Sequence, residues 1–361
     1  MQLLKSDKYA AGCWIIGCDD GFAHTKVVLL HVPYGSTTGR IVAQVSAPSR
    51  AKIGPQTLAS VLGHERLPNE FLTDGTLVSI LENASQEASS TQFDEYAFSA
   101  TNRALIQYTI LKTGLLEHFK PEDRIFIRTG LPLNRYYNNN EKNLKVIERK
   151  KDSLAIPVTL SPKAQAEFPT THCFDLKDNE VGAEGLGAWF DYVFDDSCQQ
   201  KAEGLSELSL AVVDIGGRTT DIIRLLPGAI IPFESTGTEQ TGVLSVLQDL
   251  KTAIYQTHDF EPTFLEPALQ SGFIQKRGEK LPIHDLIEQC VQANAGKIVQ
   301  GVNQRIGQAN EVDRILLVGG GASLFYPALK AQYPHCEILP DPAFCNARGF
   351  AKMEFLNRII K

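Results

Sequence analysis

The chain has 361 residues, of which 43% are hydrophobic, and its 35 basic and 42 acidic residues give a formal net charge of −7. This length exceeds what one hydrophobic core holds and predicts two domains of roughly 150 to 200 residues each. The acidic balance excludes a broad basic surface for direct nucleic-acid binding, although residues 142–151 form a local basic cluster. Any connection to DNA is therefore expected to be indirect.

Cysteine usage and the first residues of the chain indicate a cytoplasmic protein. Seven cysteines without a Cys-x-x-Cys pair argue against a disulfide framework and against a structural zinc site. Residues 1–11 carry charges, and the apolar run after them is only about five residues long. We therefore expect neither a signal peptide nor a membrane helix.

The first motif is a hairpin over residues 15–30. An apolar strand ends at Asp19-Asp20-Gly21, and a second apolar strand follows with Lys26 near its start. Strand–Asp–Gly–strand turns are common without any ligand. Glycine nevertheless lets a backbone approach phosphates and offer them N–H groups, and a carboxylate can hold magnesium through water. The turn is a candidate phosphate site, with either Asp19 or Asp20 facing the metal.

The next segments predict a sheet covered by helices. A strand is expected over residues 40–45, and the polar, proline-containing stretch 47–92 predicts a small variable subdomain. Apolar spacing predicts a helix over 99–112, with a Thr-Gly stop after it, and residues 124–129 read as a central strand. The order strand, helix, strand is typical of an α/β fold.

Residues 129–194 carry a distinctive segment and one candidate acid. Residues 129–138 read TGLPLNRYYN, and residues 147–151 read IERKK, a run that on its own is typical of a solvated helix face. Strands are expected over 156–160 and 173–176, and a helix over 185–194. Glu180 lies just before that helix, where an ordinary acid interacts with the helix dipole for roughly 0.3 to 1 kcal/mol.

A second hairpin over residues 211–223 repeats the plan of the first. An apolar strand ends at Asp214, and the turn Gly216-Gly217-Arg218-Thr219 leads into a second strand. Both hairpins carry Asp-x-Gly and a charged residue seven positions after the Asp, Lys26 in one and Asp221 in the other. This repetition predicts a duplicated fold that closes on one nucleotide.

A third glycine run completes the pattern. Helices are expected over 241–255, starting near Gly242 or Gly237, and over 283–306. The strand 314–318 enters Gly319-Gly320-Gly321-Ala322, where backbone can lie close to a flat adenosine, although an ordinary strand-to-helix turn has the same residues. Lys276 and Arg277 are candidates for the ribose side, with a solvated turn as the alternative. A last helix is expected after residues 346–350.

The three elements together resemble the superfamily of actin, heat-shock chaperones and sugar kinases. Within it, segments 129–138 and 147–151 are similar to the ParM/StbA plasmid-segregation proteins, and the resemblance covers residues 12–361. It implies an α/β fold of two actin-like, ribonuclease H-like domains with mixed sheets and a nucleotide cleft between them. Domain I would span 12–206, with its variable subdomain at about 40–100 and its completion by helix 346–361, and domain II would span 207–345.

The resemblance also implies an ATPase that uses ATP and Mg²⁺. Asp19 and Asp214 would flank the metal, Glu180 would orient the attacking water, and Lys26 would reach the phosphates. The implied nucleotide contacts further include Asp20, Gly21, Gly216, Gly217, Arg218, Thr219, Gly242, Gly319, Gly320, Gly321 and Ala322. One departure is that Phe22-Ala23 stands where relatives have Ser or Thr. A lost hydroxyl–phosphate bond costs on the order of 1.5 to 3 kcal/mol, so we expect weaker binding unless His24 or Thr25 compensates.

The expected function is an ATP-switched, filament-forming protein that segregates plasmid or similar replicon DNA. Its partners would be further copies of itself and a small DNA-binding adaptor on a centromere-like repeat, with no membrane and no strong direct DNA binding. The alternative with the same fold is a sugar or acid kinase, for which no acceptor-pocket base is evident. A DnaK-type chaperone would need a substrate domain, and an FtsA-type adaptor a membrane tail. The choice between ATP and GTP is open.

Overall fold

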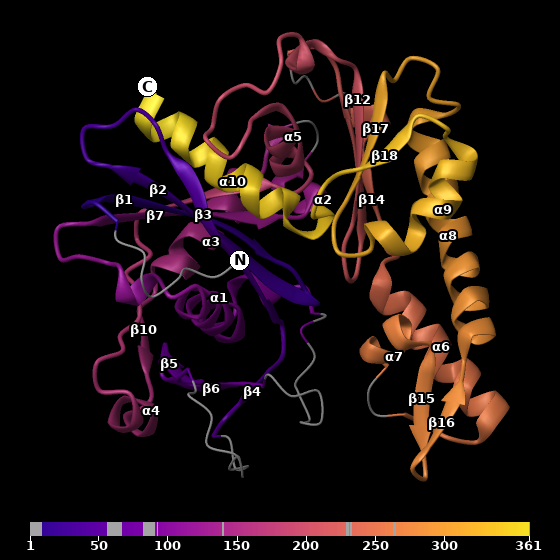
Figure 1. Ribbon diagram of the computed structural model, residues 1–361, viewed down its shortest axis with the longest axis horizontal. Helices are drawn as coiled ribbons and strands as arrows, with labels where there is room; N and C mark the ends of the chain where they lie inside the picture. Colours follow the sequence, from indigo (N-terminus) through magenta and orange to yellow (C-terminus); the bar gives the residue numbers. More distant parts are fainter. Residues whose placement is uncertain are drawn as a thin grey trace. The chain divides into compact units, whose positions relative to one another are not determined.

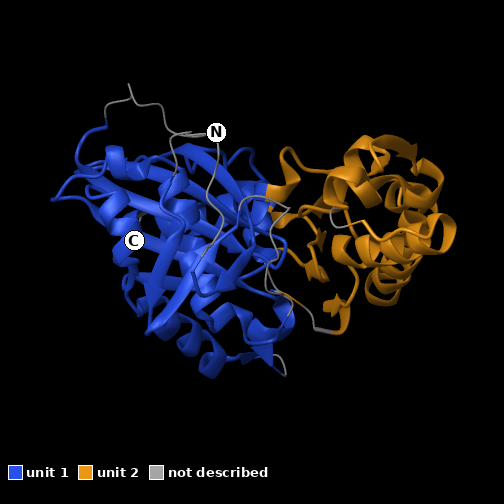
Figure 2. Ribbon diagram, turned by 90° about the horizontal axis from the view of Figure 1, so that it is seen from below, with its two compact units in different colours: residues 1–82, 87–205, 344–361 blue, residues 83–86, 206–343 orange. Residues whose placement is uncertain are grey.

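The chain divides into two compact units (Figure 2). The computed structural model describes residues 9–55, 67–81, 91, 93–138, 141–228, 231, 233–262 and 265–360. Unit 1 contains the described residues up to Leu205 and those from Phe344 onward, and unit 2 contains the described residues from Ser206 to Ala343. Parts of the expected variable subdomain, at 56–66, 82–90 and 92, lie outside the described residues.

Unit 1 is built on a five-stranded mixed sheet (Figure 1). Its strand order is β11-β7-β1-β2-β3, in which β11, β7 and β1 are parallel and β1, β2 and β3 are antiparallel. The bounds are β1 Gly12–Asp20, β2 His24–Pro33, β3 Arg40–Pro48, β7 Arg124–Leu131 and β11 Asn179–Ala183. The parallel strands end together at one edge of the sheet, where their carboxyl ends meet.

Helices cover both faces of this sheet, because β1 is apolar on both sides. Trp14, Ile16 and Cys18 pack in the core beneath α1 (Ala100–Lys112) and α3 (Leu144–Ala155). Ile15 packs on the opposite face with α10 (Cys345–Phe355). A Cβ on Gly17 would lie 1.9 Å from the Ala347 carbonyl oxygen, so only glycine lets α10 lie directly on β1.

A small antiparallel sheet and short elements complete unit 1. The small sheet has the order β10-β5-β6-β4. Its strands are β4 Ala51–Ile53, β5 Glu70–Thr73, β6 Thr76–Ile80 and β10 Val158–Leu160. The remaining elements are η1 Tyr96–Phe98, η2 Leu115–Glu117, α2 Leu133–Tyr136, β8 Tyr137–Asn138, β9 Glu141–Lys142, α4 Pro162–Glu167, α5 Leu186–Val193, η3 Leu205–Glu207 at the boundary between the units, and the C-terminal η6 Leu356–Ile360.

Unit 2 repeats the strand order of the main sheet of unit 1. Its order is β18-β17-β12-β13-β14, again with three parallel strands followed by an antiparallel meander. The strands are β12 Leu210–Ile215, β13 Thr220–Leu225, β14 Gly237–Glu239, β17 Arg314–Val318 and β18 Cys336–Ile338. The duplication expected from the two hairpins is therefore present at the level of whole sheets.

Helices of unit 2 pack on one face of its sheet. Val213 and Ile215 share a core with apolar residues of α6 (Val243–His258), α8 (His284–Ile306) and α9 (Ala322–Gln332). The other elements are η4 Phe233–Ser235, α7 Glu266–Ser271, η5 Pro342–Phe344 and a hairpin of β15 Phe273–Lys276 and β16 Glu279–Pro282. Within the described residues, no helix combines the length and apolarity that crossing a membrane requires.

Three expected elements differ from the structure. Residues 173–176 form no strand, because the Gln107 side chain donates to the Phe174 carbonyl (2.7 Å) and accepts from its N–H (3.0 Å) in place of a neighbouring strand. The edge strand is β11, which contains Glu180, so Glu180 does not lie in the loop before α5. Residues 346–350 are the first turns of α10 and do not precede it.

Candidate functional site

The turn between β1 and β2 presents a buried ion pair on the α10 face of the sheet. Asp19 and Lys26 are direct cross-strand partners, and Lys26 Nζ lies 2.8 Å from Asp19 Oδ2. Both residues are less than 10% exposed. Alternation along β1 puts Asp19 on the same face as Gly17, near the start of α10. This turn therefore brings together the carboxylate and the ammonium that the sequence singled out.

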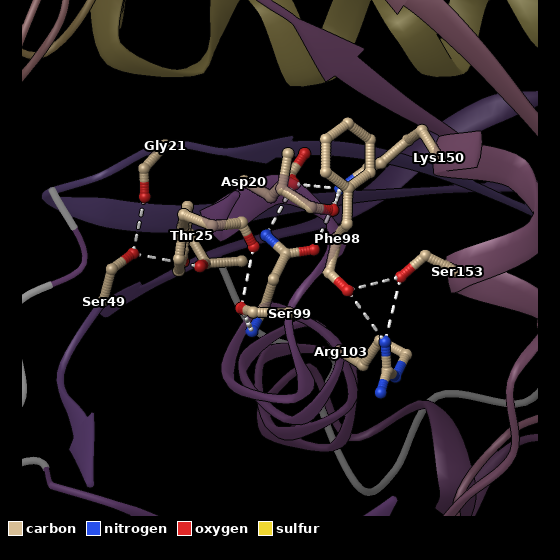
Figure 3. Close-up of polar contacts among 12 residues, drawn as sticks. Asp20, Gly21, Thr25, Ser49, Phe98, Ser99, Arg103, Lys150 and Ser153 are labelled. Atoms are coloured by element: carbon tan, nitrogen blue, oxygen red, sulfur yellow. Dashed lines mark hydrogen bonds and ion pairs between the residues drawn. The ribbon is translucent and has the colours of Figure 1, made fainter. Parts of the chain in front are cut away.

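Asp20 points to the opposite face, toward α1 and α3. Its Oδ2 accepts from Lys150 Nζ at 2.6 Å and from Asn102 Nδ2 at 2.7 Å (Figure 3). Successive side chains of a strand alternate between faces, so Asp19 and Asp20 cannot share one role. The structure does not bring Asp20 to the face of Asp19 and Lys26, and the open choice between the two acids therefore favours Asp19.

The backbone of this turn is held from behind. Ser49 Oγ donates to the Gly21 carbonyl at 2.7 Å, and Thr91 Oγ1 donates to the Phe22 carbonyl at 2.6 Å. In a trans peptide the N–H points away from the carbonyl, so the N–H groups of Phe22 and Ala23 are directed away from Ser49 and Thr91. The turn can thus offer backbone donors although it lacks a Ser or Thr hydroxyl.

The side chains of Phe22 and Thr25 both pack toward the core of unit 1. The Phe22 ring packs toward Tyr96, with ring centroids 5.5 Å apart. Thr25 is fully buried and its Oγ1 lies 3.1 Å from Ser49 Oγ, so Thr25 faces the core and does not replace the missing hydroxyl. Backbone N–H groups, Asp19 and Lys26 are thus the candidate phosphate and metal contacts of this turn, and His24 remains the candidate for replacing the hydroxyl.

The second hairpin, between β12 and β13, has the same form with a different charge. Asp214 and Asp221 are cross-strand partners, and both are less than 7% exposed. The Gly216 N–H donates to the Thr219 carbonyl at 2.9 Å, and residues 216–219 are half-buried at the turn. Where the first hairpin pairs an acid with a lysine, the second pairs an acid with an acid.

The N-terminus of α6 packs directly on the second turn. The N–H groups of Val243 and Leu244 donate to the carbonyls of Gly216 (3.2 Å) and Gly217 (2.8 Å). A Cβ on Gly242 would lie 2.5 Å from the Gly217 carbonyl oxygen. Gly242 is therefore required for the close approach of α6 to the turn.

The third glycine run joins the same cluster in unit 2. The Gly321 N–H donates to the Ile215 carbonyl at 2.8 Å. Gly319 has φ +88, and a Cβ there would lie 2.4 Å from Asp214 Oδ1. Gly320 is exposed, and a Cβ there would meet nothing within 4 Å, whereas Ala322 is buried at the start of α9. Packing explains Gly319 and Gly321, and Gly320 is the position open to a ligand.

Lys276 and Arg277 lie away from this cluster. Lys276 Nζ donates to the His258 carbonyl at 2.6 Å, at the C-terminal end of α6. The 16 residues of α6 span about 24 Å at 1.5 Å per residue, with Gly242 at the other end. Arg277 occupies the β15–β16 turn with φ +53. The positions of both residues favour the alternative, a turn within unit 2, over a contact with the ribose.

The acids at β11 differ in their place on the sheet. Glu180 pairs with Arg128 of β7 in register, and Arg128 pairs with Gly17, so Glu180 is level with the interior of β1. Its side chain is 40% exposed, and Oε1 lies 3.3 Å from Lys151 Nζ. Glu180 therefore does not lie at the edge of the sheet where Asp19 lies.

Glu184 was not anticipated from the sequence. It follows β11 at the carboxyl edge of the parallel strands, and its N–H donates to the Leu131 carbonyl at 3.0 Å. A Cβ on Gly130 would lie 3.1 Å from Glu184 Cγ, so this side chain extends over the end of β7, next to β1. Ligands of such sheets bind at the carboxyl ends of the strands. Correct placement of β11 at 179–183 would have pointed to Glu184.

Each of the two turns, taken by itself, offers one buried carboxylate that could take part in holding a magnesium–phosphate group. Across the described ranges, no three His, Cys, Asp or Glu side chains gather in a way that could hold a metal ion directly. Mg²⁺ usually keeps several waters and takes one or two carboxylates together with phosphate oxygens. Asp19 and Asp214, each buried beside a glycine turn, match that requirement.

Comparison with known families covers most of the chain. The family described as plasmid segregation protein ParM, N-terminal, matches residues 16–192. The family described as archaeal actin homologue MreB-like, C-terminal, matches residues 212–331. No curated protein matches the chain at a significant level.

Solved structures share the fold over nearly the whole chain. A non-polymerisable quadruple mutant of pCBH ParM is 17% identical, with a TM-score of 0.71 over 95% of this chain and 99% of that one. An archaeal actin homologue is 20% identical, with a TM-score of 0.71 over 94% and 99%. A 15-stranded ParM filament from Clostridium botulinum is 17% identical, with a TM-score of 0.69 over 95% and 99%. These likenesses confirm the expected actin-like fold, and the family matches show that residues 16–192 are similar to the ParM N-terminal family and residues 212–331 to the MreB-like C-terminal family.

Proposed function

We propose that this protein is a Mg-ATP-dependent ATPase that forms actin-like filaments and segregates plasmid or similar replicon DNA in the cytoplasm. The observation that carries the proposal is the pair of glycine turns, each with a buried acid at a strand end, in two sheets of the same strand order. The match of residues 16–192 to the ParM N-terminal family supports the role in segregation. In this proposal unit 1 serves as actin-like domain I and unit 2 as domain II.

The bound nucleotide would act as a switch between assembly states. Lys26 and the backbone of Gly21 to Ala23 would bind phosphate from unit 1, and Gly216 to Thr219 would bind it from unit 2. Asp19 and Asp214 would hold Mg²⁺ through water, and Gly320 would face the adenosine. A related archaeal actin homologue has been solved in complex with ADP, which supports a nucleotide as the ligand. ATP would favour assembly, and hydrolysis would loosen the polymer.

The acid that orients the attacking water comes from β11 or the residue after it. The sequence favoured Glu180, but the position of Glu184 at the carboxyl edge of the sheet fits the role better. The isosteric variants Glu184→Gln and Glu180→Gln form a matched pair. We expect the Glu184 variant to release phosphate about 100-fold more slowly with little change in ATP affinity, as for a group that acts in the transition state. Normal release from that variant and slow release from the Glu180 variant would return the role to Glu180.

The decisive test of the proposal is nucleotide-dependent polymerisation. Purified protein is followed by light scattering and by pelleting, with ATP, GTP, ADP or no nucleotide, each with and without Mg²⁺. We expect assembly with Mg²⁺ and a nucleoside triphosphate, and disassembly as phosphate is released. Failure to assemble under every condition, combined with nucleotide binding, would favour the small-molecule kinase alternative.

A further inference from the structure

A buried lysine connects α3 to the first phosphate turn. Lys150 is 0% exposed, and its Nζ donates to Asp20 Oδ2 (2.6 Å), to the Ala97 carbonyl (2.7 Å) and to Asn102 Oδ1 (2.9 Å) (Figure 3). These acceptors belong to β1, η1 and α1. A buried ammonium is tolerated only when it is paired and hydrogen-bonded, so this residue holds four segments in one arrangement.

Asp20 receives two donors that come from two helices. Lys150 of α3 and Asn102 of α1 both donate to Oδ2, and the Asn102 N–H is capped in turn by Ser99 Oγ at 3.1 Å. The next residue, Gly21, is held through its carbonyl by Ser49. The side of the turn that faces α1 is therefore fixed by side chains at two consecutive residues.

Fixing Asp20 also fixes Asp19. Neighbouring side chains of a strand point to opposite faces, so a carboxylate held toward α1 keeps its neighbour directed toward α10. Asp19 and Lys26 then remain paired on that face at 2.8 Å. Loss of the Lys150 contact would allow the end of β1 to rotate and the turn to fray.

We infer that Lys150 is a positioning residue for the nucleotide, acting through Asp20 on the phosphate-binding turn of unit 1. This inference rests on the proposed function, because the ligand at that turn is the proposed nucleotide. Lys150 does not touch the ligand, and its effect is on the geometry of the residues that do.

The alternative is an ion pair that contributes to stability alone, and unit 1 offers a matched control. Lys352 of α10 is 1% exposed, and its Nζ donates to Asp191 Oδ1 at 2.6 Å and to the Phe194 carbonyl at 2.9 Å. It lies in the helix on the opposite face of the sheet from Lys150. Lys150→Met and Lys352→Met each remove one buried ammonium from the same unit, so both should lower the melting temperature.

The experiment measures the turn with and without a ligand. In the nucleotide-free protein, amide hydrogen exchange over residues 19–25 should accelerate at least about tenfold in Lys150→Met and stay within about threefold of wild type in Lys352→Met. With Mg-ADP as the probe, calorimetry should show a dissociation constant raised about tenfold in the first variant only. Equal effects of the two variants on both measurements would overturn the inference.

A double variant keeps the test usable if Lys150→Met does not fold. Asp20→Asn with Lys150→Met removes both charges and should recover the melting temperature, while turn exchange and the Mg-ADP constant stay altered. If the exchange rate of the turn and the Mg-ADP dissociation constant both returned to wild-type values, the Lys150–Asp20 pair would be needed for stability only. If the wild type binds no nucleotide, the proposed function fails, and the exchange measurement still decides whether Lys150 positions the turn.

Discussion

The two neighbouring acids at the end of β1 point to opposite faces of the sheet and therefore have different roles. Asp19 faces Lys26, whereas Asp20 faces Lys150 on the other side of the sheet. A sequence of two consecutive acids cannot reveal this, because either could end the strand on the ligand face. Their different partners favour Asp19 over Asp20 for the proposed metal role.

Removing these acids should abolish the magnesium dependence of ATP binding. Asp19→Asn and Asp214→Asn each delete one carboxylate of the candidate site, and we expect ATP affinity in either variant to become insensitive to Mg²⁺. Asp123→Asn is the control, since Asp123 accepts from the Gly12 N–H (2.8 Å) and Trp14 Nε1 (2.9 Å) and has a structural role. It should melt earlier but keep its magnesium response, measured by calorimetry with and without EDTA. Near wild-type magnesium dependence in both site variants would contradict the assignment.

The glycines of unit 2 separate a packing requirement from a ligand requirement. A Cβ on Gly242 would clash with two backbone carbonyls, whereas one on Gly320 meets nothing within 4 Å. We expect Gly242→Ala to cost about 1 to 3 kcal/mol of unfolding free energy, in the range of overpacking. Gly320→Val should change stability by less than about 0.5 kcal/mol while weakening ATP. Urea unfolding and calorimetry distinguish these outcomes, and parallel losses in the Gly320 variant would indicate an ordinary turn.

At the scale of elements, buried ion pairs of Arg348 and Lys352 with Asp191 hold α10 against α5. Arg348 Nη2 lies 2.6 Å from Asp191 Oδ2, and Lys352 Nζ lies 2.6 Å from Asp191 Oδ1. Burial alone would raise the pKa of Asp191, but the hydrogen bond from Arg348 and the charge of Lys352 outweigh it and lower this pKa below its usual value. The carboxylate therefore stabilises the folded unit only while it is ionised.

This pKa shift predicts an acid-dependent loss of stability. A carboxyl with a lowered folded-state pKa contributes fully above its unfolded value, about 4, and loses that contribution as the pH falls through the folded value. Asp191→Asn, which removes the buried acid shared by Arg348 and Lys352, should cost about 3 to 5 kcal/mol at pH 7. Urea unfolding from pH 7 to pH 3 should show the difference from wild type narrowing only below pH 4. A constant difference would mean that Asp191 does not titrate with folding.

Local pattern predicted those elements whose partners are near in sequence. Both Asp-Gly hairpins and α1, α6 and α8 follow from period-2 or period-3.6 apolar spacing. The strand expected at 173–176 failed because its hydrogen bonds come from Gln107, a side chain 67 residues away. From the sequence, Lys150 was expected to lie on a solvated helix face with its basic neighbours. In the structure it is buried, because Asp20, 130 residues away, pairs with it. Contacts at such separations leave no local trace in the sequence, and Glu184 was missed once β11 was misplaced.

At the scale of the whole molecule, the charge balance predicts an indirect link to DNA. Phosphate contacts require clustered cations, and a chain with net charge −7 lacks a broad basic surface. We expect filaments to co-pellet with centromere-like DNA at physiological salt only when a small DNA-binding adaptor is added, and to lose that capture when ATP is replaced by ADP. Labelled DNA, candidate adaptor and purified protein are mixed in a pelleting assay. Strong co-pelleting without any adaptor would contradict this division of labour.

The placement of α10 at the end of the chain affects how unit 1 folds during synthesis on the ribosome. Unit 2 interrupts unit 1, so β1 is made first and the helix that lies on Gly17 is made only after residue 343. Domains fold largely as units during synthesis. The described residues of unit 2 lie within one continuous segment, so unit 2 can fold as soon as that segment leaves the ribosome. Unit 1 must wait with one face of its sheet uncovered until Phe350 can cover Gly130 and Gly182. A nascent chain thus carries an exposed apolar face until α10 has been translated. During this period a chaperone would be expected to bind that face.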